Sequence, residues 1–151
     1  MQPGDLIEDF TLRDQTGSFR TLSDLLEDGP VVLFFYPAAL TWGCTKESCH
    51  FRDLGAEFAA VGATRVGISM DSVQKQAKFA DKYDFDYPLL SDEDGAVAKL
   101  FGVKRRFDFL FTKRSTFVIG TDRRIRRIIS SEMSMNTHAD EALDYLRSLA
   151  V

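Results

Sequence analysis

The two cysteines, Cys44 and Cys49, are the residues of this chain best suited to redox or nucleophilic chemistry. Cys44 follows the apolar run 31–36 and a loop that begins at Pro37. The periodic apolar residues after it predict a long amphipathic helix, so we expect Cys44 in or just before the first helical turn. There the unpaired N–H groups and the positive end of the helix dipole favour a thiolate, the reactive form of cysteine. Placement alone leaves a second interpretation open, in which Cys44 is a small buried side chain without reactivity.

The spacing Cys-x-x-x-x-Cys differs from the Cys-x-x-Cys of thioredoxin-type disulfide exchangers. On an intact helix, a separation of five residues means a rise of about 7.5 Å and a rotation of about 140° beyond one full turn. A disulfide requires Cα atoms within about 7 Å and side chains that point toward each other. The two thiols therefore either never react with each other or react only when the first turns of the helix unwind. Together with His50 and His138 they lack the paired short spacings of structural zinc sites, so we expect no metal.

The composition is that of a globular protein and excludes several other classes. The 151 residues include 44% hydrophobic and 28% charged residues, with a formal net charge of −4. This balance argues against nucleic acid or an anionic membrane as the main partner, and two cysteines are too few for a disulfide-stapled secreted scaffold. The first residues lack the features of a signal peptide, and no apolar run is long enough to span a bilayer. We therefore expect a single domain over 1–151, located in the cytoplasm.

The elements that must position the cysteines alternate between strand and helix. The apolar run 31–36, which lies between chain breakers, predicts a strand buried on both faces. The other predicted strands are 65–70, 87–90, 115–119 and 125–129, and the predicted helices are 41–61, 72–83, 95–101 and 137–149. Asp71 or Ser72 is expected to cap the second helix, and Thr137 with Asp140 resembles a capping box. This order predicts an α/β fold, a thioredoxin-like sandwich with a mixed central sheet and helices on both faces.

Several segments of the chain resemble the peroxiredoxins. Pro37, Thr41 and Cys44 match the Pro-x-x-x-Thr-x-x-Cys signature of that family. The stretch 43–53 is similar to the peroxiredoxin Q, or bacterioferritin comigratory protein, subfamily. The likeness covers nearly the whole chain, through segments in the expected order: Gly4-Asp5, Asp9-Phe10, 87–92, 101–103, 114–117 and 137–140.

The resemblance implies a thiol peroxidase that reduces hydrogen peroxide and organic hydroperoxides in antioxidant defence, without metal, haem or flavin. Cys44 would be the peroxidatic thiolate that becomes a sulfenic acid, and Cys49 would be the resolving thiol that condenses with it. Thioredoxin or a glutaredoxin-like dithiol protein would then reduce the intramolecular disulfide. The family favours a monomer, with a dimer as the alternative, and neither nucleic acid nor a membrane is expected as a partner.

Four residues near the cysteines have supporting roles under this resemblance. Thr41 would place its hydroxyl on the sulfur and the peroxide, and Pro37 would shield the site from water. Arg114 would bring a permanently charged guanidinium to the thiolate, stabilise it and polarise the leaving oxygen. Glu47 lies three residues after Cys44 and would position Arg114 or a backbone group, with a solvated helix-face carboxylate as an equal alternative.

Trp42 departs from the subfamily pattern, in which a proline usually precedes Gly43. Without the fixed φ of a proline, the backbone of this loop is less restricted. The indole ring of Trp42 would also narrow access to Cys44. Because Trp42 is the single tryptophan, we expect its fluorescence to change when peroxide is added to the reduced protein.

The segment 104–127 holds nine of the nineteen basic residues, interleaved at 107–111 with aromatic and apolar side chains. Solvated loop and hairpin faces are the preferred interpretation of these charges, and a nucleic-acid or acidic-partner surface is the alternative. The aromatic residues would form either a docking patch or part of the core. No catalytic role is predicted for His50 or His138, and a helix-end role is preferred for His138.

Two other functions compete with the peroxidase. A thioredoxin-like thiol-disulfide oxidoreductase is disfavoured by the spacing of the cysteines. A non-enzymatic binding module that uses the basic segment would not need Cys44, and its binding would depend strongly on salt.

Overall fold

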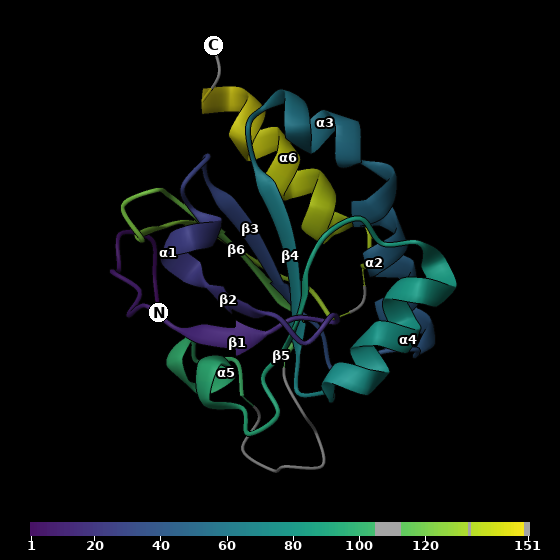
Figure 1. The fold of residues 1–151 in the computed structure, drawn as a ribbon. Coiled ribbons are helices and arrows are strands. Elements are labelled where there is room, and N and C mark those ends of the chain that lie inside the picture. The colour runs from purple at the N-terminus through teal and green to yellow at the C-terminus, as the bar shows by residue number, and fades with distance from the viewer. Residues whose placement is uncertain (105–112, 133, 150–151) are drawn as a thin grey trace.

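The computed structural model describes residues 1–104, 113–132 and 134–149, which are shown in Figure 1. Within these ranges, seven strands form one sheet in the order β2-β1-β5-β4-β3-β6-β7. The strands are β1 (Thr11–Arg13), β2 (Phe19–Thr21), β3 (Val31–Phe35), β4 (Thr64–Ser69), β5 (Leu89–Ser91), β6 (Ser115–Ile119) and β7 (Ile125–Ser130). The helices are α1 (Leu22–Leu25), α2 (Trp42–Asp53), α3 (Gly55–Ala60), α4 (Val73–Tyr83), α5 (Ala96–Leu100) and α6 (Thr137–Leu149). The sheet is mixed, as predicted.

The central strand β3 explains the continuous apolar run of the sequence. It lies between β4 and β6, and all five of its residues are buried. Val32 and Phe34 enter one core with side chains of α2, α3, α4 and α6. Val31, Leu33 and Phe35 enter a second core with side chains of α1 and α5. Figure 1 shows these two groups of helices on opposite faces of the sheet, so both faces of the strand are covered.

The pairing of β3 determines what lies beside the loop that follows it. β3 is parallel to β4 and antiparallel to β6, with Phe35 opposite Ser115. The carboxyl end of β3 therefore lies beside the beginning of β6. Since Arg114 directly precedes β6, its side chain meets the residues that follow β3, although 70 positions separate it from Cys44.

The helix predicted over 41–61 is two helices, α2 and α3, with a break at Leu54. At the break, Arg65 Nη1 donates hydrogen bonds to the carbonyl oxygens of Phe51, at 3.0 Å, and Arg52, at 3.5 Å. An added Cβ at Gly55 would lie 3.1 Å from Arg65 Nη2, so glycine leaves room for this guanidinium. The apolar periodicity correctly predicted which face of the two helices is buried. The Arg65 side chain, from β4, binds the last carbonyl groups of the first helix and ends it.

Other differences concern short elements and one helix start. β1, β2 and α1 were not predicted, because three or four residues are too few to show a period. Ser72 caps α4 by accepting a hydrogen bond from the Lys75 N–H, which confirms one of the two candidate caps. The capping box at Thr137 was wrong, since Thr137 is already helical and the Asn136 carbonyl accepts from the Asp140 N–H.

None of the helices in the described ranges has the length and apolar character needed to cross a membrane.

Candidate active site

Cys44 lies in the first turn of α2, as the sequence predicted. Thr41 precedes the helix in an extended conformation, and its side chain does not cap the helix. Cys44 is the third residue of α2, where backbone N–H groups have no acceptor inside the helix. The sulfur therefore faces the positive end of the helix dipole. Cys44 is 1% exposed and packs with the core on the α2 face of the sheet.

Arg114 joins this sulfur to a second acidic group. Its Nη2 donates to Cys44 Sγ at 3.3 Å, and its Nη1 donates to Glu47 Oε1 at 2.9 Å. The guanidinium is buried, with its charge held by these two partners. Burial by itself lowers the pKa of Arg114, but Glu47 and Cys44 raise it on balance, so the cation is retained. The predicted contact between Arg114 and the cysteine is present.

Gly43 is required for this contact. A Cβ at Gly43 would lie 3.3 Å from both Arg114 Nη2 and Met135 Sδ. Contacts that close require a neighbour to shift, and one of those neighbours is the nitrogen that holds Cys44 Sγ. A glycine immediately before the cysteine therefore lets the guanidinium approach the start of α2.

Glu47 is a buried member of the site. Its side chain has 0% exposure, so the alternative of a solvated carboxylate on the helix face was wrong. It lies one turn after Cys44 along α2, which places both side chains against Arg114. Burial raises the pKa of Glu47 to about 8, although Arg114 opposes the shift. Its second oxygen, Oε2, accepts no hydrogen bond from the described residues.

His138 belongs to the same cluster, which sequence reasoning did not predict. It is fully buried in α6, with Nε2 at 3.5 Å from Glu47 Oε2. Nε2 also lies 2.7 Å from the Ser131 carbonyl, and Nδ1 lies 2.8 Å from Thr116 Oγ1. Burial lowers the pKa of His138. The one available signal in the sequence was its position next to Ala139, on the apolar face of the last helix. That position also suits an unreactive core residue.

The loop between β3 and α2 holds the two other predicted residues. Pro37 is half-buried, and the Thr41 hydroxyl donates to the Ala38 carbonyl at 2.7 Å. The predicted hydrogen bond from Thr41 to the sulfur is not present in this state of the protein. Leu40 has φ of 67°, an unusual backbone conformation for a residue with a side chain.

Asp71 holds this loop from the neighbouring strand and was also missed. Its Oδ2 accepts from the Ala39 N–H at 2.7 Å and from the Ser69 hydroxyl at 2.6 Å. Since Ser69 ends β4, which pairs with β3, the loop is tied to the sheet next to the strand it leaves. The sequence marked Asp71 as a possible helix cap, and its actual role is in tertiary structure.

Cys49 lies on the same uninterrupted helix as Cys44, and both thiols are free. It is half-buried and packs against the α2 side of the core. Burial raises the pKa of the Cys49 thiol, while Arg52 opposes this shift. Cys44 Sγ accepts a hydrogen bond from the Arg114 cation, whereas burial raises the pKa of Cys49, so the two sulfurs lie in different electrostatic surroundings.

Trp42 extends into solvent. Its side chain is 76% exposed, and Lys46 Nζ lies 5.6 Å from the ring centroid. An indole with this exposure is not packed over the sulfur, and its effect on access to Cys44 stays a prediction.

The basic and aromatic segment is described only in part, because 105–112 lie outside the described residues. The aromatic and apolar side chains predicted as a docking patch or core, Phe107, Phe109, Leu110 and Phe111, all belong to that range. Of the remaining basic residues, Arg114 belongs to the site and Arg126 pairs with Asp122 at 2.7 Å. The other histidine, His50, contacts Asp140 at 2.7 Å on the surface. Within the described ranges, no group of three or more His, Cys, Asp or Glu side chains could hold a metal ion.

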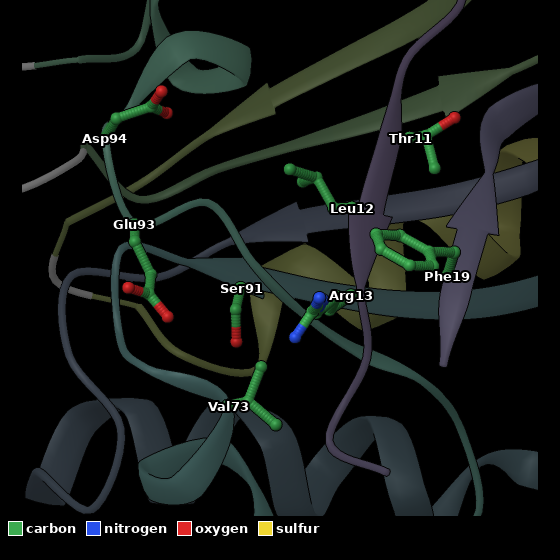
Figure 2. Close-up of a pocket in the computed structure, with 8 residues that line it drawn as sticks. All are labelled: Thr11, Leu12, Arg13, Phe19, Val73, Ser91, Glu93 and Asp94. Atoms are coloured by element: carbon green, nitrogen blue, oxygen red, sulfur yellow. The ribbon is translucent and has the colours of Figure 1, made fainter. Parts of the chain in front are cut away.

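A separate hollow of about 330 Å³ lies near β1 and β2, and Figure 2 shows its walls. Arg13 and Phe19 form one side, with the guanidinium 4.8 Å from the ring centroid, and Ser91 and Glu93 lie opposite. None of the residues predicted for catalysis lines it. Cys44 does not line this hollow.

A buried thiol at the start of a helix, in a mixed sheet with helices on both faces, defines the class of thioredoxin-like thiol proteins. Residues 3–128 match the AhpC/TSA family. A relative from Mycobacterium tuberculosis that is named as a peroxiredoxin is 63% identical over 151 residues, which cover 99% of this chain and 98% of the relative. The chain belongs to the AhpC/TSA family of peroxiredoxins.

Solved structures agree with this assignment. The crystal structure of peroxidoxin BcpB from Mycobacterium tuberculosis has a TM-score of 0.94 at 63% identity, covering 99% of this chain and 98% of that one. The bacterioferritin comigratory protein of Xanthomonas campestris has a TM-score of 0.85 at 31% identity, covering 94% and 92%. The predicted thioredoxin-like fold and the resemblance to the peroxiredoxin Q group are confirmed. Family membership supports a thiol-dependent peroxidase and does not favour a disulfide oxidoreductase.

Proposed function

We propose that this chain reduces hydrogen peroxide and organic hydroperoxides with Cys44 as the peroxidatic residue. The contact that carries the proposal is the one between Arg114 Nη2 and Cys44 Sγ, at 3.3 Å in a buried site. A fixed cation beside a sulfur stabilises the thiolate, and it also stabilises the charge that develops when the peroxide bond breaks. The Xanthomonas relative is described as having alkyl peroxide reduction activity.

In the first step the thiolate attacks one oxygen of the hydroperoxide. A sulfur–oxygen bond forms, the oxygen–oxygen bond breaks, and the departing alkoxide or hydroxide takes up a proton. Cys44 is oxidised to a sulfenic acid and the peroxide is reduced to an alcohol or water. Arg114 is the group placed to hold the developing negative charge.

In the second step Cys49 resolves the sulfenic acid. Its thiol attacks the sulfur of Cys44, water leaves and an intramolecular disulfide forms. Both cysteines lie on one continuous helix, where five residues of separation prevent a disulfide, so the first turns of α2 must unwind. The raised pKa of Cys49, caused by burial, is consistent with a thiol that does not react until this rearrangement.

A dithiol protein such as thioredoxin, or a glutaredoxin-like protein, would complete the cycle by reducing the disulfide. We place this cycle in the cytoplasm, where disulfides are kept reduced by such proteins. We also propose a monomer, because the polar groups around Cys44 come from α2, from Arg114 directly before β6 and from α6 of one chain.

The test is hydroperoxide consumption coupled to thioredoxin and its reductase. Wild type, Cys44→Ser and Cys49→Ser form a matched set, because each single variant keeps one of the two thiols of the chain. We expect no reaction from Cys44→Ser. Cys49→Ser should consume one equivalent of peroxide, gain one oxygen atom in mass and then stop. Normal turnover by Cys44→Ser would overturn the proposal.

A further inference from the structure

One guanidinium serves two acidic groups in this site. Arg114 gives a separate nitrogen to each, Nη1 to Glu47 Oε1 and Nη2 to Cys44 Sγ. Both Glu47 and Cys44 are buried, with exposures of 0% and 1%. A single cation balances a single anion, and a second buried anion beside it would carry a large desolvation penalty.

Among the residues that the structure describes, the groups that surround Glu47 supply no second cation. His138 faces it from α6, and the Ser131 carbonyl can only accept a hydrogen bond, so Nε2 of His138 carries a hydrogen. Nδ1 is then free to accept from the Thr116 hydroxyl, which is the pattern of a neutral imidazole. The lowered pKa of His138 agrees with this state.

A further charged group near Glu47, within the described part of the chain, is an acid. Glu132 precedes α6, accepts a hydrogen bond from the Arg114 backbone N–H and raises the pKa of Glu47 further. Arg114 is thus the one cation among the described groups that face Glu47. The raised pKa of Glu47, about 8, agrees with a carboxyl group that holds a proton at neutral pH.

We propose that Glu47 and Cys44 share one proton through Arg114, and that the negative charge moves from Cys44 to Glu47 when the sulfur is oxidised. Before the reaction, the thiolate is the counter-ion of Arg114 and Glu47 is a neutral acid. The sulfenic acid that forms is neutral, so Arg114 then needs a new counter-ion. Glu47 becomes that counter-ion by losing its proton, which balances the proton taken up by the leaving oxygen.

The balanced step has the thiolate, the Glu47 carboxylic acid and a hydroperoxide as reactants. Its products are the sulfenic acid, the Glu47 carboxylate and an alcohol. The sulfur–oxygen bond forms as the oxygen–oxygen bond breaks, and total charge is unchanged. Glu47 is a positioning residue that acts through Arg114. The inference rests on the proposed reaction of Cys44 with peroxide.

Infrared difference spectroscopy tests the transfer of charge directly. The Cys49→Ser variant should be reduced and then given one equivalent of hydrogen peroxide, because its reaction stops at the sulfenic acid. We expect the carbonyl band of a protonated carboxyl group to disappear, in proportion to Cys44 oxidised, while carboxylate bands appear. In D2O the lost band should shift, which identifies it as a protonated acid.

Two further changes in the same background identify the residue. Glu47→Gln should remove the band change, and Glu57→Gln, a matched change on α3, should keep it. If Cys44 gains its oxygen atom and no carboxyl band is lost, the inference is overturned and the peroxidase function stands. If Cys44 gains no oxygen atom, the proposed function itself fails.

Proton uptake provides a second measurement that does not depend on assigning a band. In weak buffer at pH 7 with a pH indicator, Cys49→Ser should take up no net proton when it is oxidised. The Cys49→Ser, Glu47→Gln double variant should take up about one proton for each sulfur oxidised, because the leaving oxygen must then be protonated from solvent. Equal uptake by the two proteins would overturn the inference.

Discussion

The two halves of α2 are held in very different ways. The second half packs Phe51 against Phe34, with the ring centroids 4.1 Å apart and the planes nearly parallel. The Tyr87 hydroxyl donates to the Ser48 carbonyl at 2.7 Å, and Arg65 donates to the Phe51 carbonyl. This half is therefore fixed to the sheet through side chains and through its own backbone.

The first half has much weaker attachments. Trp42 is exposed, Thr41 makes no side-chain cap and the first turn contains no acidic residue. A missing side-chain cap costs a helix about 1 kcal/mol. This half contacts the rest of the protein through Cys44 and Glu47, which bind Arg114, and through the packing of Cys44 in the core.

This comparison shows where the helix can open during the proposed cycle. In the proposed cycle, oxidation of Cys44 moves the negative charge that attracts Arg114 from Cys44 to Glu47, and so loosens the attachment of the first turn of α2. The contacts of Ser48 and Phe51 that fix the second half do not involve Cys44 and remain when its sulfur is oxidised. Unwinding should therefore begin at Trp42 and stop before Phe51, which would free Cys44 and leave Cys49 near the fixed part of α2.

The largest expected effect follows from removing the anchor of the second half. Phe51→Ala should lower the free energy of unfolding by about 3–5 kcal/mol, because it leaves a cavity between two stacked rings. Denaturant unfolding of the reduced protein measures this loss. The matched change Trp42→Ala, in the first half, should shift stability by no more than about 0.5 kcal/mol. Equal losses from the two variants would contradict the comparison.

A slower reaction is expected when Arg114 can no longer bind Cys44 and Glu47 with two separate nitrogens, an arrangement called the fork below. Arg114→Lys keeps the charge but cannot hold Cys44 and Glu47 with two nitrogens at once. Its reaction with peroxide should slow by roughly 10²–10³-fold, the usual cost of losing one such donor. Stopped-flow measurement with Arg126→Lys as the control is suitable, since Arg126 pairs with Asp122 away from the site. A rate within twofold of the wild type would show that the fork is not needed.

The pH dependence of the free energy of unfolding should change when Glu47 is replaced by glutamine, which does not titrate. Folded Glu47 has a pKa of about 8, above its ordinary value of 4.5, so the folded protein keeps a proton that the unfolded chain releases. This contribution to stability is complete below about pH 4.5 and is lost as the pH rises through about 8. Urea unfolding at several pH values should show a smaller decline across this window for Glu47→Gln than for wild type. Parallel curves would exclude a buried proton on Glu47.

The smallest expected effect is an optical one. Trp42 lies in the part of α2 that should unwind, so its fluorescence should change when peroxide is added to reduced protein. The shift should be modest, because the ring is 76% exposed before the reaction. Cys44→Ser should show no change. If wild type consumes peroxide normally and its Trp42 fluorescence stays constant, the start of α2 does not unwind at Trp42 during the reaction.

Much of the fold could be predicted from local pattern. The strand 115–119 and the helix 137–149 have the predicted bounds, and the other longer elements differ by one or two residues except at α2. The break after α2 was not predictable, because Arg65 on β4 caps the helix and belongs to a different part of the chain. The capping box at Thr137 failed because Ser, Thr and Asn near a helix start are all possible caps, and local sequence does not rank them.

The site was predictable to the extent that its chemistry depends on residue type and local position. Cys44 at the beginning of a helix, the spacing to Cys49 and the Arg114 segment were all visible in the chain. Glu47 was visible only as an ambiguous carboxylate. Asp71 was considered as a helix cap, since nothing local shows that it reaches the loop after β3.

The amino-acid sequence by itself thus determined which sulfur atom lies at the start of a helix and why the two cysteines cannot form a disulfide while that helix is intact. The tertiary structure decided the charge that surrounds that atom. Arg114 reaches Cys44 because β6 pairs with β3, and His138 reaches Glu47 because α6 packs on the same face of the sheet. Charge balance in a buried site depends on which groups are brought within a few ångströms of each other. Groups far apart in the chain meet only when the sheet has formed.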